Sequence, residues 1–111
     1  MIETENWMNK IRKLNPLIEK TEFQALKAEA EHKKLLAMLK LEALADGIKT
    51  DSAQNTYAES KIELFDSRIK IASYKSGLVA LKLELKATEI GFEQWRTEQV
   101  NLRKEKTRYG A

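Results

Sequence analysis

The residues best suited to metal chemistry are Glu29 and His32, which have Glu-x-x-His spacing. On a helix this spacing places both side chains on one face, as in di-iron carboxylate bundles. Those sites use the motif twice and add further glutamates, whereas His32 is the only histidine of the chain. We therefore interpret Glu29 and His32 as helix-surface residues, and predict neither a metal site nor a cofactor.

Catalytic constellations are hard to assemble from the remaining residues. The chain has no cysteine, and with one histidine no Ser/His/Asp or Cys/His set stands out. No glycine-rich phosphate loop is present, because Gly77 and Gly91 lie inside helical patterns. Acidic residues are plentiful, but nothing singles out a pair, and a thin hairpin offers no pocket to shift a pKa. The sequence predicts a protein that is not an enzyme and has no small-molecule substrate.

The C-terminal segment combines aromatic and basic residues. An exposed Trp95 beside arginines would anchor a protein partner or stack on a nucleic-acid base. Two plainer interpretations stay open: the basic residues complement the helix dipole, and Trp7 packs on Trp95 at the open end of a hairpin. The candidate partner- or nucleic-acid-binding residues are Phe92, Trp95, Arg96, Arg103, Lys104, Lys106 and Arg108.

The elements that position these residues are helices. The 111 residues are 42% apolar and 33% charged, with one proline and four glycines, a composition typical of long helices and coiled coils. The net charge of +3 is weak evidence for nucleic acid, since charges of both signs alternate on solvated helix faces. We predict a single elongated all-α domain.

Local signals predict three helical segments and a tail. A short helix covers residues 5–14 and ends at Asn15-Pro16, where Asn is a good N-cap and Pro suits a first helical position. The first hairpin arm covers residues 16–46 and closes at Asp46-Gly47. Asp51 and Gln54 resemble a capping box that opens the longer second arm, residues 51–106. Residues 107–111 are a frayed tail. The short loop makes the arms a long antiparallel helical hairpin.

The second arm carries two apolar stripes. The first alternates steps of four and three, as in a coiled-coil seam, and we predict that it packs on the first arm. The second advances by sevens and would be covered by the 5–14 helix or by a second protomer. Past about Leu83 the first arm has ended. The first stripe comprises Ala58, Ile62, Phe65, Ile69, Ala72, Ser76, Val79, Leu83 and Ile90, and the second Leu64, Ile71, Leu78, Leu85 and Phe92.

The N-terminal residues are polar and acidic, and no apolar run approaches the ~20 residues that a membrane span needs. We expect no signal peptide, no membrane contact and a cytoplasmic protein.

Several short motifs resemble a group of small coiled-coil proteins of bacteriophages and prophages. They are Gly47-Ile48-Lys49-Thr50, Tyr57-Ala58, Phe92-Glu93-Gln94-Trp95-Arg96-Thr97 and Asn101-Leu102-Arg103. The resemblance covers roughly residues 20–105 and implies a Gly-turn between two long helices and a bacterial host cytoplasm. It also implies a context near phage recombination or replication genes. The residues carried over are Trp95, Arg96 and Arg103.

Three functional hypotheses follow. The first is a non-enzymatic phage-type accessory protein that binds another protein through its coiled-coil surface and its C-terminal Trp/Arg end. The partner would be a phage recombination or replication protein, or a host factor. A homo-dimer or higher oligomer would cover the second stripe. The second is single-strand nucleic-acid binding by the basic helix end. The third is an inhibitor that inserts the hairpin tip, residues 47–51, into a partner.

Overall fold

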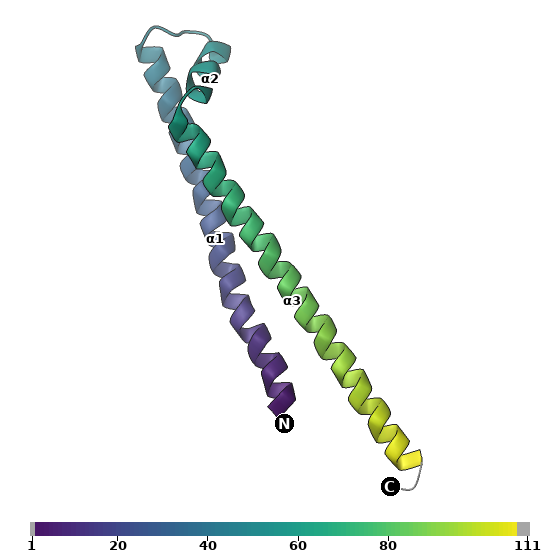
Figure 1. Ribbon diagram of the computed structural model, residues 1–111. Coiled ribbons are helices and arrows are strands. Elements are labelled where there is room, and N and C mark those ends of the chain that lie inside the picture. The colour runs from purple at the N-terminus through teal and green to yellow at the C-terminus, as the bar shows by residue number, and fades with distance from the viewer. Residues whose placement is uncertain (1, 109–111) are drawn as a thin grey trace. The chain divides into compact units, whose positions relative to one another are not determined.

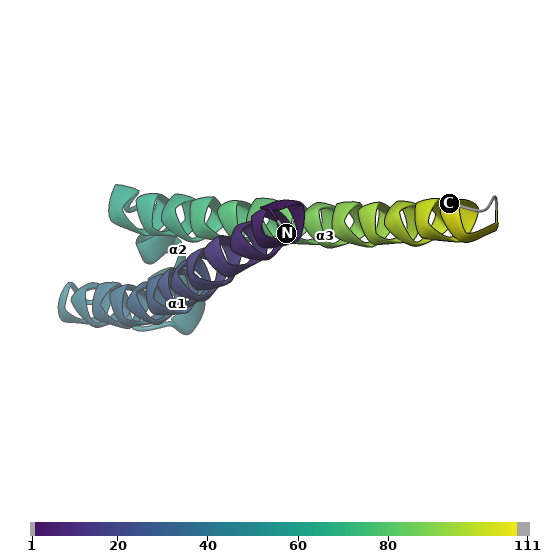
Figure 2. The ribbon, with the colours of Figure 1, turned by 90° about the horizontal axis from the view of Figure 1, so that it is seen from below.

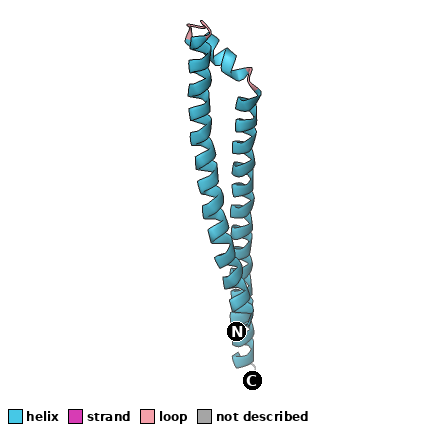
Figure 3. Cartoon of the chain, turned by 90° about the vertical axis from the view of Figure 1, so that its left-hand side faces the viewer, coloured by secondary structure: helices cyan, strands magenta, loops and turns pink. Residues whose placement is uncertain are grey.

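A computed structural model describes the backbone of residues 2–108. It contains three helices: α1 (Ile2–Ala45), α2 (Asp51–Glu59) and α3 (Ile62–Arg108) (Figure 1). The described residues contain no strand, and the loops lie only between the helices (Figure 3). The all-α class and the antiparallel helical hairpin are thereby confirmed. The chain has two compact units, Glu19–Leu78 and Met1–Ile18 with Val79–Ala111, which are described separately, and the single domain stays a prediction.

The predicted helix end at Asn15-Pro16 is wrong, because α1 continues through Pro16. A proline inside a helix removes one backbone hydrogen bond and crowds the carbonyl four residues earlier. Pro16 is exposed, on the side of α1 opposite Leu14 and Ile18, so that water can solvate the carbonyl left without its donor. The packing of α1 on α3 on both sides of Pro16 compensates for the local cost.

The turn after α1 agrees with the prediction at Asp46-Gly47. Gly47 has φ +89°, a left-handed conformation that glycine adopts without steric penalty. The N–H of Ile48 donates to the carbonyl of Ala43 at 3.0 Å, and the N–H of Gly47 donates to that of Leu44 at 3.0 Å. This pair of bonds is a Schellman motif, which satisfies the last carbonyls of the helix.

The helix after the turn begins at Asp51, as predicted, but its N-cap and its end differ from the prediction. The N-cap is Thr50, not Asp51, since the Thr50 hydroxyl accepts from the N–H of Ala53 at 3.2 Å. The predicted continuous arm 51–106 breaks after Glu59, where the Ser60 hydroxyl donates to the Tyr57 carbonyl at 2.6 Å. Short polar side chains that bond the backbone in this way compete with helix continuation.

Beyond this break, α3 is one uninterrupted helix that passes through both Gly77 and Gly91 (Figure 2). Gly77 has only the Cγ2 of Thr21 nearby, 4.0 Å from where a Cβ would stand. Mid-helix glycine is tolerated in α3 because packing, rather than local propensity, stabilises the long helix.

In the unit Glu19–Leu78, α1 and α3 pack through rows of side chains spaced alternately by three and four residues, as in a coiled coil. Many of the buried residues are alanines, which let two helix backbones approach closely. Near the turn, α2 adds Ala58 to a core cluster with Leu39 and Leu64. The buried or half-buried row of α1 is Thr21, Ala25, Ala28, His32, Leu35 and Leu39, and that of α3 is Leu64, Ser67, Ile71, Tyr74 and Leu78.

In the other unit, the first part of α1 packs on the last part of α3 through rows with the same spacing. The half-buried row of α3 from Leu85 to Gln99 therefore packs on the N-terminal part of the chain's own α1. The row of α1 is Thr4, Trp7, Ile11, Leu14 and Ile18, and that of α3 is Leu81, Leu85, Thr88, Phe92, Trp95 and Gln99.

The predicted roles of the two stripes are exchanged. The stripe expected to pack on the first arm is exposed, with Phe65 at 56% and Ile69 at 54% of full exposure, and only Ala58 of its members is buried. The stripe expected to be covered by the 5–14 helix or by a second protomer contains Leu64, which is 0% exposed, and forms the row that faces α1. Its last member, Phe92, contacts Trp7 of the 5–14 segment, in agreement with the first of these alternatives. Leu64 packs in the core cluster with Leu39 of α1 and Ala58 of α2.

Candidate partner-binding notch on α3

The aromatic residues of the C-terminal segment form one cluster with Trp7. The rings of Trp7 and Phe92 lie with centroids 6.4 Å apart at an interplanar angle of 47°. Phe92 in turn stacks on Trp95 at 6.2 Å and 18°. Such pairs add about 0.5–1.5 kcal/mol to the burial of the rings. The expected direct packing of Trp7 on Trp95 is therefore modified, because Phe92 joins the two indoles.

A notch of about 280 Å³ lies beside this cluster, within the same unit. The half-buried rings of Phe92 and Trp95 supply its apolar part, while Arg96 and Arg103 are exposed. The two arginines are seven residues apart, so they project from the same row of α3. The residues that line the notch are Thr4, Phe92, Trp95, Arg96, Gln99, Val100 and Arg103.

The remaining predicted site residues are not part of the notch. Lys104 lines an adjoining depression with Val100, Arg103 and Thr107. Lys106 is exposed and lines neither. Arg108 is the last residue of α3, and its side chain lies outside the described residues. The structure thus brings together four of the seven predicted residues and places Lys104 next to them.

The two arginines differ in their surroundings. The guanidinium of Arg96 lies 3.3 Å from the Glu93 carboxylate and 5.8 Å from the centroid of the Phe92 ring. Among the described residues, no carboxylate lies within ion-pair distance of Arg103. Arg103 is therefore the cation of the notch with the most freedom to bind an anion.

Trp95 contributes an unusual polar group. Its indole Nε1 is buried and has no hydrogen-bond acceptor within the described residues. The indole N–H is a donor only, and a buried donor without an acceptor costs about 1–3 kcal/mol.

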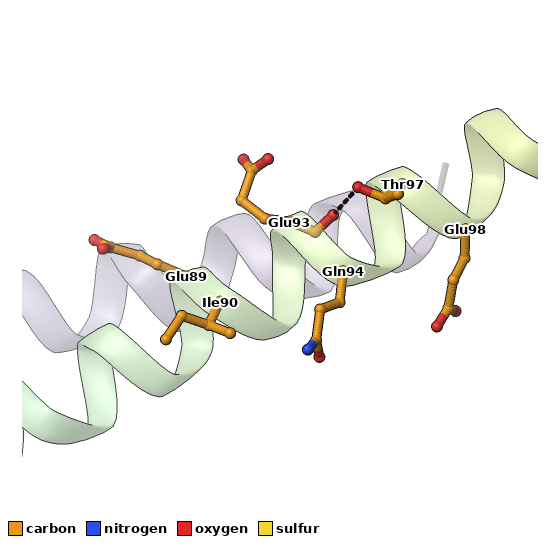
Figure 4. Close-up of a pocket in the computed structure, with 6 residues that line it drawn as sticks. All are labelled: Glu89, Ile90, Glu93, Gln94, Thr97 and Glu98. Carbon is orange, nitrogen blue, oxygen red and sulfur yellow. Dashed lines mark hydrogen bonds between the residues drawn. The ribbon is translucent and has the colours of Figure 1, made fainter.

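Another surface depression lies on the outer side of α3, and Figure 4 shows it. It is formed by one helix alone, with Glu93 and Thr97 on one side and Gln94 and Glu98 on the other. The hydroxyl of Thr97 already donates to the Glu93 carbonyl at 2.9 Å. A surface of this kind has no opposing wall to hold a small molecule.

The residues weighed for metal chemistry lie elsewhere, at the α1–α3 contact of the unit Glu19–Leu78. His32 Nδ1 is 3.0 Å from the Ser67 hydroxyl, and Glu29 pairs with Lys75 at 2.6 Å. Both are half-buried, so they lie at the edge of the contact between the two helices. No group of three metal-ligating side chains occurs in the described part of the chain.

Sequence reasoning missed Thr4, Gln99 and Val100 as notch residues. The signal that could have found Gln99 is the spacing of the packed row of α3, since Gln99 follows Phe92 and Trp95 at alternating steps of three and four residues. Thr4 precedes Trp7 by three residues and so shares its helix face.

Comparisons of this chain with protein-family models, with curated proteins and with solved structures give no match. No helix in the part of the chain that the structure describes is long and apolar enough to cross a membrane. What the fold defines is the class of all-α antiparallel helical hairpins.

Proposed function

We propose that the chain is a non-enzymatic accessory protein that binds another protein at the notch on α3. The observation that carries the proposal is the aromatic surface of Phe92 and Trp95 next to Arg96 and Arg103. Tryptophan and arginine at the edge of a small concavity are the residue types most enriched among interface hot spots.

The notch has a definite chemical preference. The exposed guanidinium of Arg103 favours an acceptor oxygen, and the aromatic rings of Phe92 and Trp95 favour an apolar neighbour. A partner segment with a carboxylate beside an apolar side chain satisfies both. The resemblance to phage coiled-coil proteins supports a phage recombination or replication protein, or a host factor, as the source of this segment.

Binding to single-stranded nucleic acid is the second candidate. The exposed Arg103, Lys104 and Lys106 support it, since each would neutralise a phosphate. The position of Trp95 counts against it, because its ring is half-buried and stacked on Phe92 instead of being open to a base.

The test compares capture of proteins from host and phage lysates by the wild type, Arg103→Glu and Lys82→Glu. Lys82 lies on the same row of α3 outside the notch and is also exposed, so it controls for charge. We expect one partner to be captured by the wild type and Lys82→Glu, but not by Arg103→Glu. Equal capture by all three proteins would contradict the proposal.

A parallel measurement separates the alternatives. Fluorescence anisotropy with a labelled oligothymidylate at low salt is expected to show no binding at micromolar protein. Binding that weakens steeply with salt and is lost in Arg103→Glu would support the nucleic-acid function instead. Loss of capture after substitution in residues 47–51, with the notch intact, would support the inhibitor hypothesis.

A further inference from the structure

The exposed stripe of α3 has the spacing of a second coiled-coil seam. In the unit Glu19–Leu78 we name it the outer seam; its large residues Ile62, Phe65 and Ile69 are each more than half exposed. Scattered apolar residues on a surface are ordinary, but a contiguous row of them marks an interaction site. The outer seam consists of Ile62, Phe65, Ile69, Ala72 and Ser76, and its spacing continues along α3 at Val79, Leu83 and Ile90.

The chain's own α1 cannot cover this row. At 100° per residue, the outer seam lies roughly 150° around α3 from the row of Leu64 and Ile71 that contacts α1. Its steps of three and four residues are those that a second α-helix requires for knobs-into-holes packing. The occupant that this pattern fits is therefore another helix.

The charges beside the outer seam decide which helix. One flanking row of α3 is basic and includes Arg68 and Lys75. These cations are already paired within the chain, Arg68 with Glu59 through two N–H···O contacts and Lys75 with Glu29 at 2.6 Å. An acidic helix of another protein would have to compete with Glu59 and Glu29 for these cations. A second copy of α3 would not have to break these pairs.

The other flanking row is small or acidic, with Asp66 and Ser73. In a parallel pair of α3 helices, each basic row faces the small and acidic row of its partner. In an antiparallel pair, the basic row would face itself. Ile62 and Ile69 stand at positions where β-branched residues favour two parallel strands.

We propose that two copies of this chain associate through the outer seam, with their α3 helices parallel. Such a contact is isologous and closes on itself as a dimer. It places each Ile69 opposite Ile69 of the second copy, and it leaves the notch beside Trp95 outside the outer seam. The proposal therefore does not depend on the proposed function.

The first experiment is sedimentation equilibrium of the purified protein and of Ile69→Lys. We expect twice the 12.8 kDa chain mass for the wild type and a single chain mass for the variant. Circular dichroism should show the same helix content in both, because Ile69 is exposed in the hairpin. A monomeric wild type at about 100 μM, or a dimeric Ile69→Lys, overturns the proposal.

The orientation is tested by crosslinking, which is simple because the chain contains no cysteine. Mild oxidation of Ile69→Cys should give a disulfide-linked dimer on a non-reducing gel, since like residues face each other within disulfide range in a parallel pair. Glu63→Cys, exposed on another side of α3, is the matched control and should stay largely monomeric. A dimer in which Ile69→Cys fails to crosslink, or crosslinks no better than Glu63→Cys, overturns the parallel pairing.

Discussion

The indole of Trp7 lies against the backbone of Gly91, so that a Cβ built on Gly91 would stand 2.9 Å from Cη2 and 3.0 Å from Cζ3 of the ring. Because the same ring contacts Phe92, Trp7 cannot move away without disturbing the aromatic cluster of the notch. Glycine at this position is a packing requirement, and the register of α1 on α3 in this unit depends on it.

Alanine substitution of the two helical glycines should therefore have opposite outcomes. At Gly77 the space is open, and Gly77→Ala should raise the free energy of unfolding by about 0.5–1 kcal/mol, the usual helix-propensity gain. In Gly91→Ala the new Cβ would clash with the Trp7 ring, which should offset the helix-propensity gain. The displaced ring should also shift the tryptophan emission. Urea denaturation followed by fluorescence measures both. Equal stabilisation by the two substitutions would show that Trp7 does not pack on Gly91.

The continuity of α1 through Pro16 can be tested at Asn15. If a helix began at Pro16, Asn15 would be its N-cap, and Asn15→Ala would cost about 1 kcal/mol. Inside a continuous helix, alanine is the better residue, and the same substitution should stabilise the protein by a few tenths of a kcal/mol. Asn9→Ala, at another exposed position inside α1, is the control. We expect the two substitutions to change the free energy of unfolding in the same direction. A loss of stability in Asn15→Ala alone would instead indicate that a helix ends before Pro16 and a new one begins there.

The ion pair between Glu59 and Arg68 joins the end of α2 to α3 and predicts a dependence of stability on pH. The hydrogen bonds from Arg68 hold the pKa of the Glu59 carboxyl below its ordinary value of 4.5, and Glu59 raises the pKa of Arg68. Since the carboxyl pKa is lowered in the folded state, the stabilisation is complete above pH 4.5 and is lost as the pH falls through the lowered value.

Glu59→Gln should therefore reduce the free energy of unfolding at pH 7 and reduce it less at about pH 3, because the contribution of the charged carboxylate declines as the pH falls below 4.5. Both proteins are exposed to the same acid effects at Glu29, whose pKa is lowered by Lys75, so this contribution cancels. Chemical denaturation at the two pH values measures the difference. If Glu59→Gln were less stable than the wild type by the same amount at both pH values, the pair would not act through its charge.

Helix content and the turn at Gly47 were predictable because they depend on local signals: composition, a left-handed glycine, and the absence of proline after residue 16. The arginine row of the notch was also predictable, since seven-residue spacing places Arg96 and Arg103 on one face. The contribution of Thr4 was not, because it depends on how α1 is aligned with α3, and tertiary contacts such as Trp7 on Gly91 set that alignment.

The exchange of the two stripes has a physical cause that the sequence contains only in part. The exposed stripe has the larger apolar residues at its start. Further along α3, however, the same spacing falls on the charged residues Lys86 and Glu93. The buried row starts with Leu64 and includes polar residues, yet its spacing continues without a charge to Phe92 and Trp95. Hydrogen bonding also favours it, because Ser67 in this row faces His32 of α1.

The neighbours Leu64 and Phe65 test this assignment most directly. Leu64 is 0% exposed in the core cluster with Leu39 and Ala58, so Leu64→Ala removes buried methyl groups and leaves a cavity, at a cost of about 2–5 kcal/mol. Phe65 is 56% exposed, and Phe65→Ala should cost less than about 1 kcal/mol. Both substitutions should be made in the Ile69→Lys background, so that association of copies does not contribute to the measured stability. Urea denaturation followed by circular dichroism gives the two free energies, and a larger cost at Phe65 than at Leu64 would mean that α3 packs on α1 through the stripe that the structure exposes.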